Sequence, residues 1–234
     1  MTTVAPILLV EADRGLGEAL AQQLAADGYR VELARNERHA RLLARETRPR
    51  LAVLGRLETP RGALSLLEEI RAGEPAQVWD RRLPALVLGA AAAELDALRA
   101  FEAGADDFLK LPVAYLELRA RLSALLRRAA EEPPETASPI EVGALTIDPE
   151  RREVTVEGTP LALRRMEFEL LVHLAGEPDR VFARSELLRA IWGYRSDGST
   201  RTVDTHACRL RAKLRGAGAE RWVICVWGIG YRLR

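Results

Sequence analysis

A basic segment near the carboxyl terminus is the part of this sequence best suited to binding chemistry. Residues 195–215 include six Arg or Lys and two Asp, which leaves an excess of four positive charges in a chain whose net charge is +1. At helical spacing, one side collects apolar residues (Val203, Ala207, Leu210 and Leu214) and the other collects small and basic ones (Arg201, Thr205, Cys208, Arg209 and Ala212). Such a helix suits a DNA major groove, because small side chains permit close approach and arginines bond base edges or phosphates. The alternative is a solvated surface helix.

Other reactive residue types are too sparse for most catalytic sites. Lys110 and Lys213 are the only lysines, and neither follows a GxxxxG segment, so a Walker loop is absent. His39, His173 and His206 are scattered, without an HExxH or CxxC pattern that would indicate zinc. There is also no GxSxG or GxGxxG motif. We therefore expect a protein that is not an enzyme and has no cofactor or metal.

Length and composition limit the remaining classes. A chain of 234 residues favours two compact units, and a hydrophobic fraction of 48% excludes wholesale disorder. Cys208 and Cys225 cannot form a disulfide scaffold, and no basic start precedes an apolar run, since the first arginine is Arg14. The most apolar stretch, 83–95, is too short to span a bilayer. We expect a cytoplasmic protein with no membrane association.

In the first half, short apolar runs alternate with amphipathic stretches. The runs have the length of buried strands and occupy residues 6–10, 29–33, 51–54, 83–88 and 107–109. Five such strands alternating with five helices predict an α/β domain over 1–130, a doubly wound, flavodoxin-like parallel sheet. In open sheets of this kind the functional crevice lies beyond the carboxyl ends of the strands.

A second pattern begins after a proline-rich segment. Residues 131–139 contain three prolines and no large apolar side chain, which predicts a linker. From 140 to 234 we predict an α+β domain, a helix-turn-helix with a β-wing. Its elements are strands at 144–148 and 152–156, helices at 167–174, 185–192 and 201–215, and a strand-like end at 222–233.

Ordered motifs in both halves resemble those of OmpR/PhoB-type response regulators of two-component systems. They are ILLVE (7–11), GADDF (104–108), ELRAR (117–121), EFELL (167–171), RSELL (184–188), IWGY (191–194), RTVDTHACRLRAKL (201–214) and GIGYR (228–232). The resemblance covers nearly the whole chain. It implies a receiver domain followed by a winged-helix domain that regulates transcription at operator or promoter double-stranded DNA. The implied protein partners are a second copy of the chain and, as a further candidate, RNA polymerase.

The resemblance also implies the DNA contacts. On the helix these are Arg201, Thr205, His206, Cys208, Arg209 and Arg211. Cys208 departs from the pattern, because a basic or polar base-reading residue is common there. Trp227 stands where the wing usually presents an arginine to the minor groove. We expect Trp227 to pack within the wing, with an apolar contact to the duplex as the alternative. These departures indicate a shifted or weaker sequence preference.

The phosphorylation site implied by the resemblance is altered at nearly every position. A working receiver needs an acceptor Asp after the third strand, acids for Mg²⁺ after the first, and a hydroxyl and a lysine for the phosphate. This chain has Glu11 and Ala12 after the first strand, then Gly55, Gly89 and Leu111 at the other three positions. Lys110 is one residue early and faces the opposite side of an extended strand, whereas the aromatic switch position survives as Phe108. We expect Glu11 to be a solvated acid, and the receiver to be atypical and independent of aspartyl phosphorylation.

The implied dimer face involves Arg99, Asp107, Glu117 and Arg121, with Asp107 and Arg121 as the favoured charge pair. Ala97 lacks the basic side chain that would complete the network. The alternative is that these are ordinary surface charges of little energetic value.

Three functional hypotheses follow. The favoured one is a dimeric, sequence-specific transcription regulator that acts without phosphorylation. The second is a protein–protein adaptor with weakened DNA binding. The third is a pseudo-receiver that senses a ligand in the crevice lined by Ala12, Gly55, Gly89 and Leu111. Redox sensing by Cys208 or Cys225 is the least favoured variant, because free cysteines are more often packing residues.

Overall fold

The computed structural model describes residues 6–57, 61–73, 79–89, 94–130, 138–193, 201–219 and 222–234. Contacts within the chain divide it into two units, Met1–Ala129 and Ala130–Arg234. The predicted linker, 131–139, lies for the most part outside the described residues. Among the helices in these ranges, none has the length and hydropathy needed to cross a bilayer.

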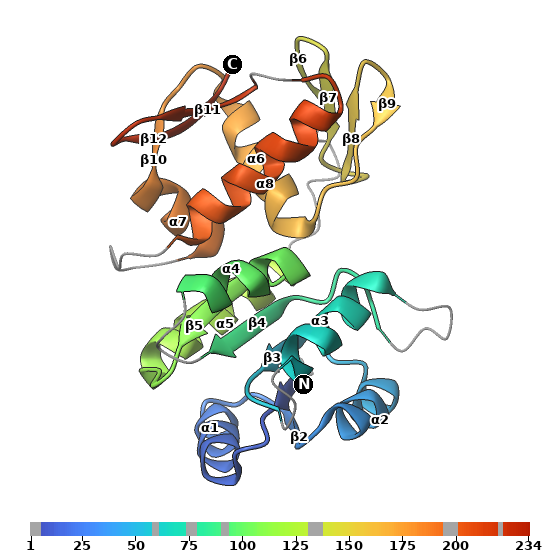
Figure 1. The fold of residues 1–234 in the computed structure, drawn as a ribbon, viewed down its shortest axis with the longest axis vertical. Coiled ribbons are helices and arrows are strands. Elements are labelled where there is room, and N and C mark those ends of the chain that lie inside the picture. The colour runs from blue at the N-terminus through green and yellow to red at the C-terminus, as the bar shows by residue number, and fades with distance from the viewer. Residues whose placement is uncertain are drawn as a thin grey trace. The chain divides into compact units, whose positions relative to one another are not determined.

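The first unit is a five-stranded parallel sheet with a helix in each connection (Figure 1). Its strands are β1 (Ile7–Val10), β2 (Val31–Ala34), β3 (Leu51–Leu54), β4 (Ala85–Gly89) and β5 (Asp107–Lys110), in the spatial order β2-β1-β3-β4-β5. Its helices are α1 (Arg14–Ala26), α2 (Glu37–Thr47), α3 (Gly62–Ala72), α4 (Glu94–Ala103) and α5 (Tyr115–Ala130).

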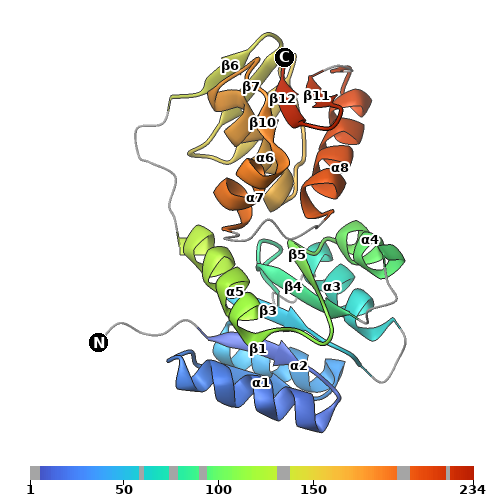
Figure 2. The same cartoon turned by 90° about the vertical axis from the view of Figure 1, so that its left-hand side faces the viewer.

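Both faces of this sheet are covered, which explains the almost unbroken apolar sequence of its strands. Every residue of β1 and β3 is fully buried. Leu8 and Val10 pack with residues of α2, α3 and α4, whereas Ile7 and Leu9 pack with residues of α1 and α5. Figure 2 shows the helices on the two sides of the sheet. Because the strands are parallel, the loops that follow β1, β3, β4 and β5 meet at one edge.

The described part of the second unit contains three helices and two antiparallel sheets. The first sheet has the order β6-β7-β8-β9, and the second has the order β10-β12-β11. The strands are β6 (Ile140–Val142), β7 (Leu145–Asp148), β8 (Glu153–Val156), β9 (Thr159–Pro160), β10 (Phe182–Ala183), β11 (Val223–Val226) and β12 (Gly230–Leu233). The helices are α6 (Arg165–Gly176), α7 (Arg184–Trp192) and α8 (Thr202–Gly216).

A single core joins these elements. It includes Leu170 and Leu174 of α6, Leu187 of α7, and Leu210 and Leu214 of α8. The apolar stripe predicted on the basic helix is therefore buried against the rest of the unit. The opposite side of α8 remains exposed, as a helix-turn-helix arrangement requires.

The structure confirms the predicted fold class, a doubly wound α/β sheet followed by an α+β winged helix-turn-helix. Strands β6, β9 and β10 were not expected. They contain three, two and two residues, and segments this short leave no readable hydrophobic period. Their pairing with β7, β8 and β12 comes from tertiary packing.

Candidate functional site

At the carboxyl edge of the first sheet, Glu11 points into the protein. It follows β1 and has no exposed surface. Its Oε1 accepts a hydrogen bond from the backbone N–H of Asp13 at 2.9 Å, and its Oε2 accepts one from the N–H of Arg56 at 3.1 Å. The expectation of a solvated acid was therefore wrong. Two backbone N–H groups from separate loops satisfy the carboxylate in place of water.

Glu11 occupies the space that a side chain at position 55 would need. A Cβ added to Gly55 would lie 2.1 Å from Glu11 Oε2 and 3.0 Å from its Cδ. The backbone oxygen of Val10 would lie 3.1 Å from the same Cβ. An acceptor Asp at position 55 and Glu11 in this conformation therefore exclude each other.

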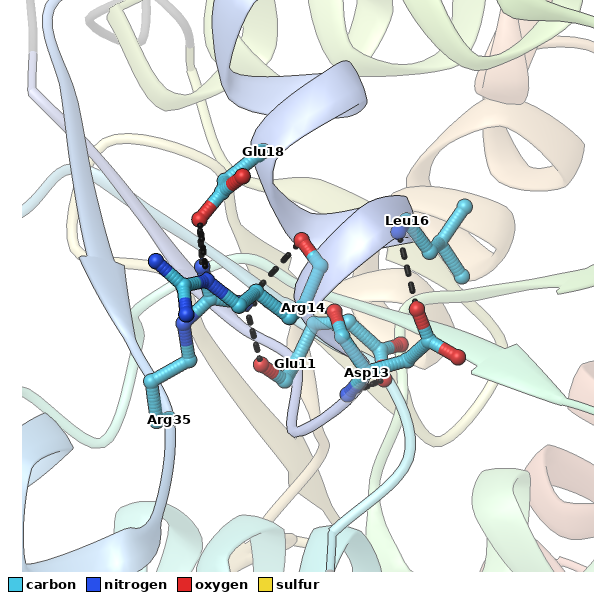
Figure 3. A network of polar contacts seen from close by, with 6 residues as sticks. All are labelled: Glu11, Asp13, Arg14, Leu16, Glu18 and Arg35. Atoms are coloured by element: carbon cyan, nitrogen blue, oxygen red, sulfur yellow. Dashed lines mark hydrogen bonds and ion pairs between the residues drawn. The ribbon is translucent and has the colours of Figure 1, made fainter.

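Arg35, directly after β2, binds the loop between β1 and α1 (Figure 3). Its Nη1 donates to the carbonyl oxygens of Glu11 (3.5 Å), Asp13 (3.1 Å) and Arg14 (3.4 Å), and its Nη2 donates to Glu18 Oε1 at 3.1 Å. Carboxylate and carbonyl oxygens are the protein ligands that Mg²⁺ uses. In this loop a guanidinium group takes several of them instead.

Asp13 is also engaged in structural contacts. Its Oδ1 accepts the N–H of Leu16 at 2.9 Å and caps the start of α1, while its Oδ2 pairs with Arg56 Nη2 at 3.2 Å. With Arg35, this pair places two guanidinium groups around the loop after β1. Fixed positive charges there disfavour a divalent cation.

The hydroxyl position after β4 is filled in the same way. A Cβ added to Gly89 would lie 2.4 Å from Phe108 Cζ and 2.6 Å from its Cε2. The Phe108 ring is buried, with 8% of the residue exposed. A Thr or Ser at position 89 could enter only if this ring moved.

The lysine position after β5 is apolar. Leu111 packs against the core on the α1 and α5 side of the sheet, whereas Lys110 is exposed. These positions, with Gly55 and Gly89, do not fit Mg²⁺ and a phosphoryl group. Within the described ranges, no three His, Cys, Asp or Glu side chains gather as a metal site. The side chains of Glu11 and Phe108 occupy the space that a Cβ at Gly55 or Gly89 would need.

On the second unit, the exposed side of α8 is basic and otherwise small. The exposed residues along it are Arg201, Cys208, Arg211, Ala212, Arg215 and Gly216. Thr205 lies among them, and its hydroxyl donates to the Arg201 carbonyl at 3.0 Å. Arginines beside short side chains are suited to bonding phosphates and base edges.

Two of the predicted contact residues are not on that exposed side. His206 is 3% exposed and its ring packs against Trp192, with centroids 5.4 Å apart. The Arg209 side chain is 19% exposed, and its Nε lies 3.4 Å from Glu167 Oε1 on α6. The structure thus places both side chains against the interior. The physical reason is helical phase, since His206 lies one turn before the core residue Leu210.

Glu167 joins α6 to α8 from a fully buried position. Its Oε2 accepts the backbone N–H of Arg164 at 2.8 Å and lies 2.7 Å from Lys213 Nζ. Burial raises the pKa of Glu167, but the hydrogen bonds from Lys213 and Arg164 and the charges of Lys213 and Arg209 outweigh it, so the pKa is lowered. Glu167 therefore stays ionised and fixes the rotation of α8.

Asp204, in the first turn of α8, joins this helix to α7 and to the wing, the hairpin of β11 and β12. Its Oδ1 accepts from Arg184 Nε at 2.8 Å and from the Tyr231 hydroxyl at 2.5 Å. Burial, and then the hydrogen bond to Asp204, raise the pKa of Tyr231 well above its usual value, which keeps the hydroxyl a donor. One carboxylate thus couples the three elements.

The wing ends in an exposed apolar tip. Trp227 is 93% exposed and Ile229 is 56% exposed. The preferred interpretation of Trp227, packing within the wing, was therefore wrong. The three-residue connection from Trp227 to Ile229 places the indole at the end of the hairpin, where it stays exposed.

The favoured dimer pair forms within one chain. Arg121 Nη1 lies 3.1 Å and 3.0 Å from the two carboxylate oxygens of Asp107, whose residue is 1% exposed. Arg121 also pairs with Glu117 one turn earlier. Arg99 is exposed and lies 3.8 Å from Asp96 on the same helix. Asp107 and Arg121 therefore satisfy each other internally.

A parallel sheet with altered strand-end loops, followed by a winged helix with an exposed basic helix, defines a regulator of the receiver and DNA-binding type. Residues 158–233 match the family model "Transcriptional regulatory protein, C terminal". The response regulator MprA of Mycolicibacterium vanbaalenii is 36% identical over 230 residues, which cover 97% of this chain and 96% of that protein. The DNA-binding response regulator MtrA of Mycolicibacterium smegmatis is 35% identical over 227 residues, with 97% and 95% covered.

A solved structure is also similar in fold over nearly the whole chain. A cysteine-to-serine mutant of RitR superposes with a TM-score of 0.73 and 27% identity, covering 98% of this chain and 99% of that one. The chain belongs to the OmpR/PhoB family of DNA-binding response regulators.

Proposed function

We propose that this protein regulates transcription as a sequence-specific DNA-binding protein whose receiver acts without aspartyl phosphorylation. The observation on which this depends is the mutual exclusion at the strand ends. Glu11 Oε2 lies where the side chain of an acceptor at position 55 would begin. Glycine has no side-chain oxygen to phosphorylate, and Arg35 holds the loop after β1.

The proposed DNA contacts are on the exposed side of α8. They are Arg201, Thr205, Cys208, Arg211, Ala212 and Arg215. Arg209, Lys213 and His206 support the helix from behind. Because the bond donors at the duplex are arginines, operator affinity should fall steeply as salt is raised.

The test is selection of duplexes from a random library by the purified, untreated protein. We expect one preferred sequence with two half-sites about one helical turn apart, roughly 10 base pairs. Adding acetyl phosphate and Mg²⁺ should leave the intact mass and the operator affinity unchanged, whereas a phosphorylatable receiver treated in parallel should gain one phosphoryl group. A phosphoryl adduct that alters operator affinity would refute phosphorylation independence, and selection of no sequence even at low salt would refute operator binding.

We further propose that the protein binds its operator as a homodimer formed through the receiver. Leu98 of α4 and Leu116 of α5 are 43% and 67% exposed, and Arg99 and Glu117 beside them are exposed charges. Apolar side chains surrounded by charge are typical of an interface between subunits. Sedimentation velocity should show a dimer whose population rises with concentration and falls in Leu116→Arg; a monomer at every concentration would contradict this.

A further inference from the structure

The tip of the wing has a composition that differs from the rest of the DNA-binding unit. The segment from Val226 to Gly230 has the sequence Val-Trp-Gly-Ile-Gly, with no charged side chain. Among the described residues, five large hydrophobic side chains are exposed, and the other three (Leu42, Leu98 and Leu116) are in the first unit. Trp227, at 93%, is the most exposed of the five.

This tip lies at the end of a regularly paired hairpin. Strands β11 and β12 pair in register from Val223 with Leu233 to Val226 with Gly230. The N–H of Ile229 donates to the Val226 carbonyl at 3.0 Å and closes the turn, and Gly228 supplies the positive φ of 73°. A Cβ on Gly230 would lie 1.8 Å from the Phe182 carbonyl oxygen, so β12 lies tightly against β10. The backbone at Trp227 is thus held by the hairpin, while its indole stays exposed.

A hydrogen bond close to the tip of the hairpin also joins the hairpin to α8. Tyr231 lies four residues after Trp227 and donates to Asp204 in the first turn of α8. Four residues of extended chain span at most about 14 Å. A duplex that contacts Thr205 in that turn, and Arg201 just before it, is therefore within reach of the indole.

We propose that Trp227 and Ile229 form an apolar wedge that enters the minor groove beside the α8 contacts, partly unstacks one base step and bends the operator. This inference rests on the proposed DNA-binding function. A tip without charged side chains cannot neutralise phosphate charge. It gains free energy from a duplex by covering sugar edges and base faces. The step it enters is selected by its deformability, which favours a flexible pyrimidine–purine step such as TA or CA.

The experiment uses the full chain and duplexes with the sequence that the wild-type protein selects. 2-Aminopurine replaces each adenine in turn on either side of the α8 contacts, and bending is measured by circular permutation of the site. We expect increased 2-aminopurine fluorescence at one step and a bend of roughly 20–90°. Trp227→Ala should remove both signals and weaken binding about tenfold.

Two control variants separate a wedge from a simple contact. Trp227→Arg should retain binding through a new phosphate contact, with a salt slope steeper by about one, but without unstacking. Leu42→Ala removes another exposed apolar side chain, 53% exposed in the first unit, and should change neither signal.

Each other outcome contradicts the wedge. If the wild-type protein binds its selected duplex without a bend or fluorescence change, or if Trp227→Ala bends it equally well, the inference is wrong while operator binding stands. A Trp227→Ala variant that alters sedimentation but not DNA distortion would show that the tip contacts a second copy of the chain. If the wild-type protein selects no sequence, the proposed function itself fails.

Discussion

Two buried glutamates, one in each unit, have opposite effects on their surroundings. Glu11 and Glu167 are both fully buried. Backbone N–H groups of two loops hold Glu11 at the strand ends, and there its carboxylate excludes a side chain at Gly55. Cationic side chains of α8 hold Glu167, and there it orients a helix whose other side is exposed. In the first unit, the buried side chain of Glu11 fills the space beside Gly55. In the second unit, buried Glu167 orients α8 so that its basic side is exposed.

The comparison shows how the first unit can keep its fold with a buried carboxyl group at its strand ends. A buried carboxylate is tolerated when hydrogen bonds replace its water. Glu11 obtains these from the backbone N–H groups of Asp13 and Arg56, so its burial does not depend on a metal ion. Glu167 in the DNA-binding unit depends on particular side chains instead. Replacing or moving Lys213 or Arg209 would leave its buried charge with less compensation.

The largest effect should come from removing Glu167. Glu167→Ala leaves Arg209 and Lys213 turned toward an interior without their counter-charge, and should lower the free energy of unfolding by about 3 kcal/mol at pH 7. Urea unfolding of the full chain measures this, with hydrogen exchange to localise the loss to α6 and α8. The matched control is Glu169→Gln on the same helix, whose partly exposed pair with Arg152 should contribute less than about 1 kcal/mol. Equal losses in both variants would contradict the special role of Glu167.

The same group predicts an acid limb of stability. Because the folded-state pKa of Glu167 is lowered, the stabilisation it provides is present above its unfolded-state pKa, near 4.3, and is lost as the pH falls through the lower folded value. The Gln side chain of Glu167→Gln cannot titrate. Between pH 5 and pH 3, a range of roughly two units around that pKa, the second unit of this variant should therefore lose less stability than the wild-type unit does. An unchanged acid limb would show that other carboxylates dominate.

The next prediction tests whether Glu11 fills the space beside Gly55. Gly55→Ala forces its methyl group against Glu11 Oε2 and should cost about 2 kcal/mol, typical of overpacking. Gly176→Ala is the control, because no atom lies within 4 Å of its added Cβ. In a double-mutant cycle, Glu11→Ala should relieve part of the Gly55→Ala cost. Additive free energies would disprove the contact.

A smaller effect is expected at Gly89. Gly89→Ala meets the far edge of the Phe108 ring, which can shift more easily than a hydrogen-bonded carboxylate, so we expect a loss of about 1.5 kcal/mol. Thermal unfolding of Gly89→Ala and of Gly89→Ala with Phe108→Leu measures the coupling. If the second substitution gives no relief, the ring does not fill the hydroxyl position in solution.

The sequence predicted the fold better than it predicted side-chain directions. Alternating apolar runs and helical leucines located all five strands of the first sheet, because burial on both faces leaves an unbroken apolar pattern. The inward turn of Glu11 depends on the N–H of Arg56, which is distant in sequence, and local spacing cannot indicate it. His206 is different, because its position one turn before Leu210 already indicated the core side of α8. The family motif predicted a DNA contact for His206, whereas its helical spacing predicted burial, and the structure agrees with the spacing.

Arg211 and Arg209, two residues apart on α8, offer the most sensitive test of the comparison. Arg211 is exposed, whereas Arg209 faces Glu167. Arg211→Ala should weaken operator binding about fivefold, or ~1 kcal/mol, and reduce the salt slope by about one, with unchanged stability. Arg209→Ala should do the reverse, lowering the unfolding free energy and leaving the salt slope as it is. Titrations of both variants at several salt concentrations, beside urea unfolding, measure the two quantities. If Arg209→Ala alone reduced the salt slope, the side chain would leave Glu167 to contact phosphate, and buried charge in this unit would serve binding directly.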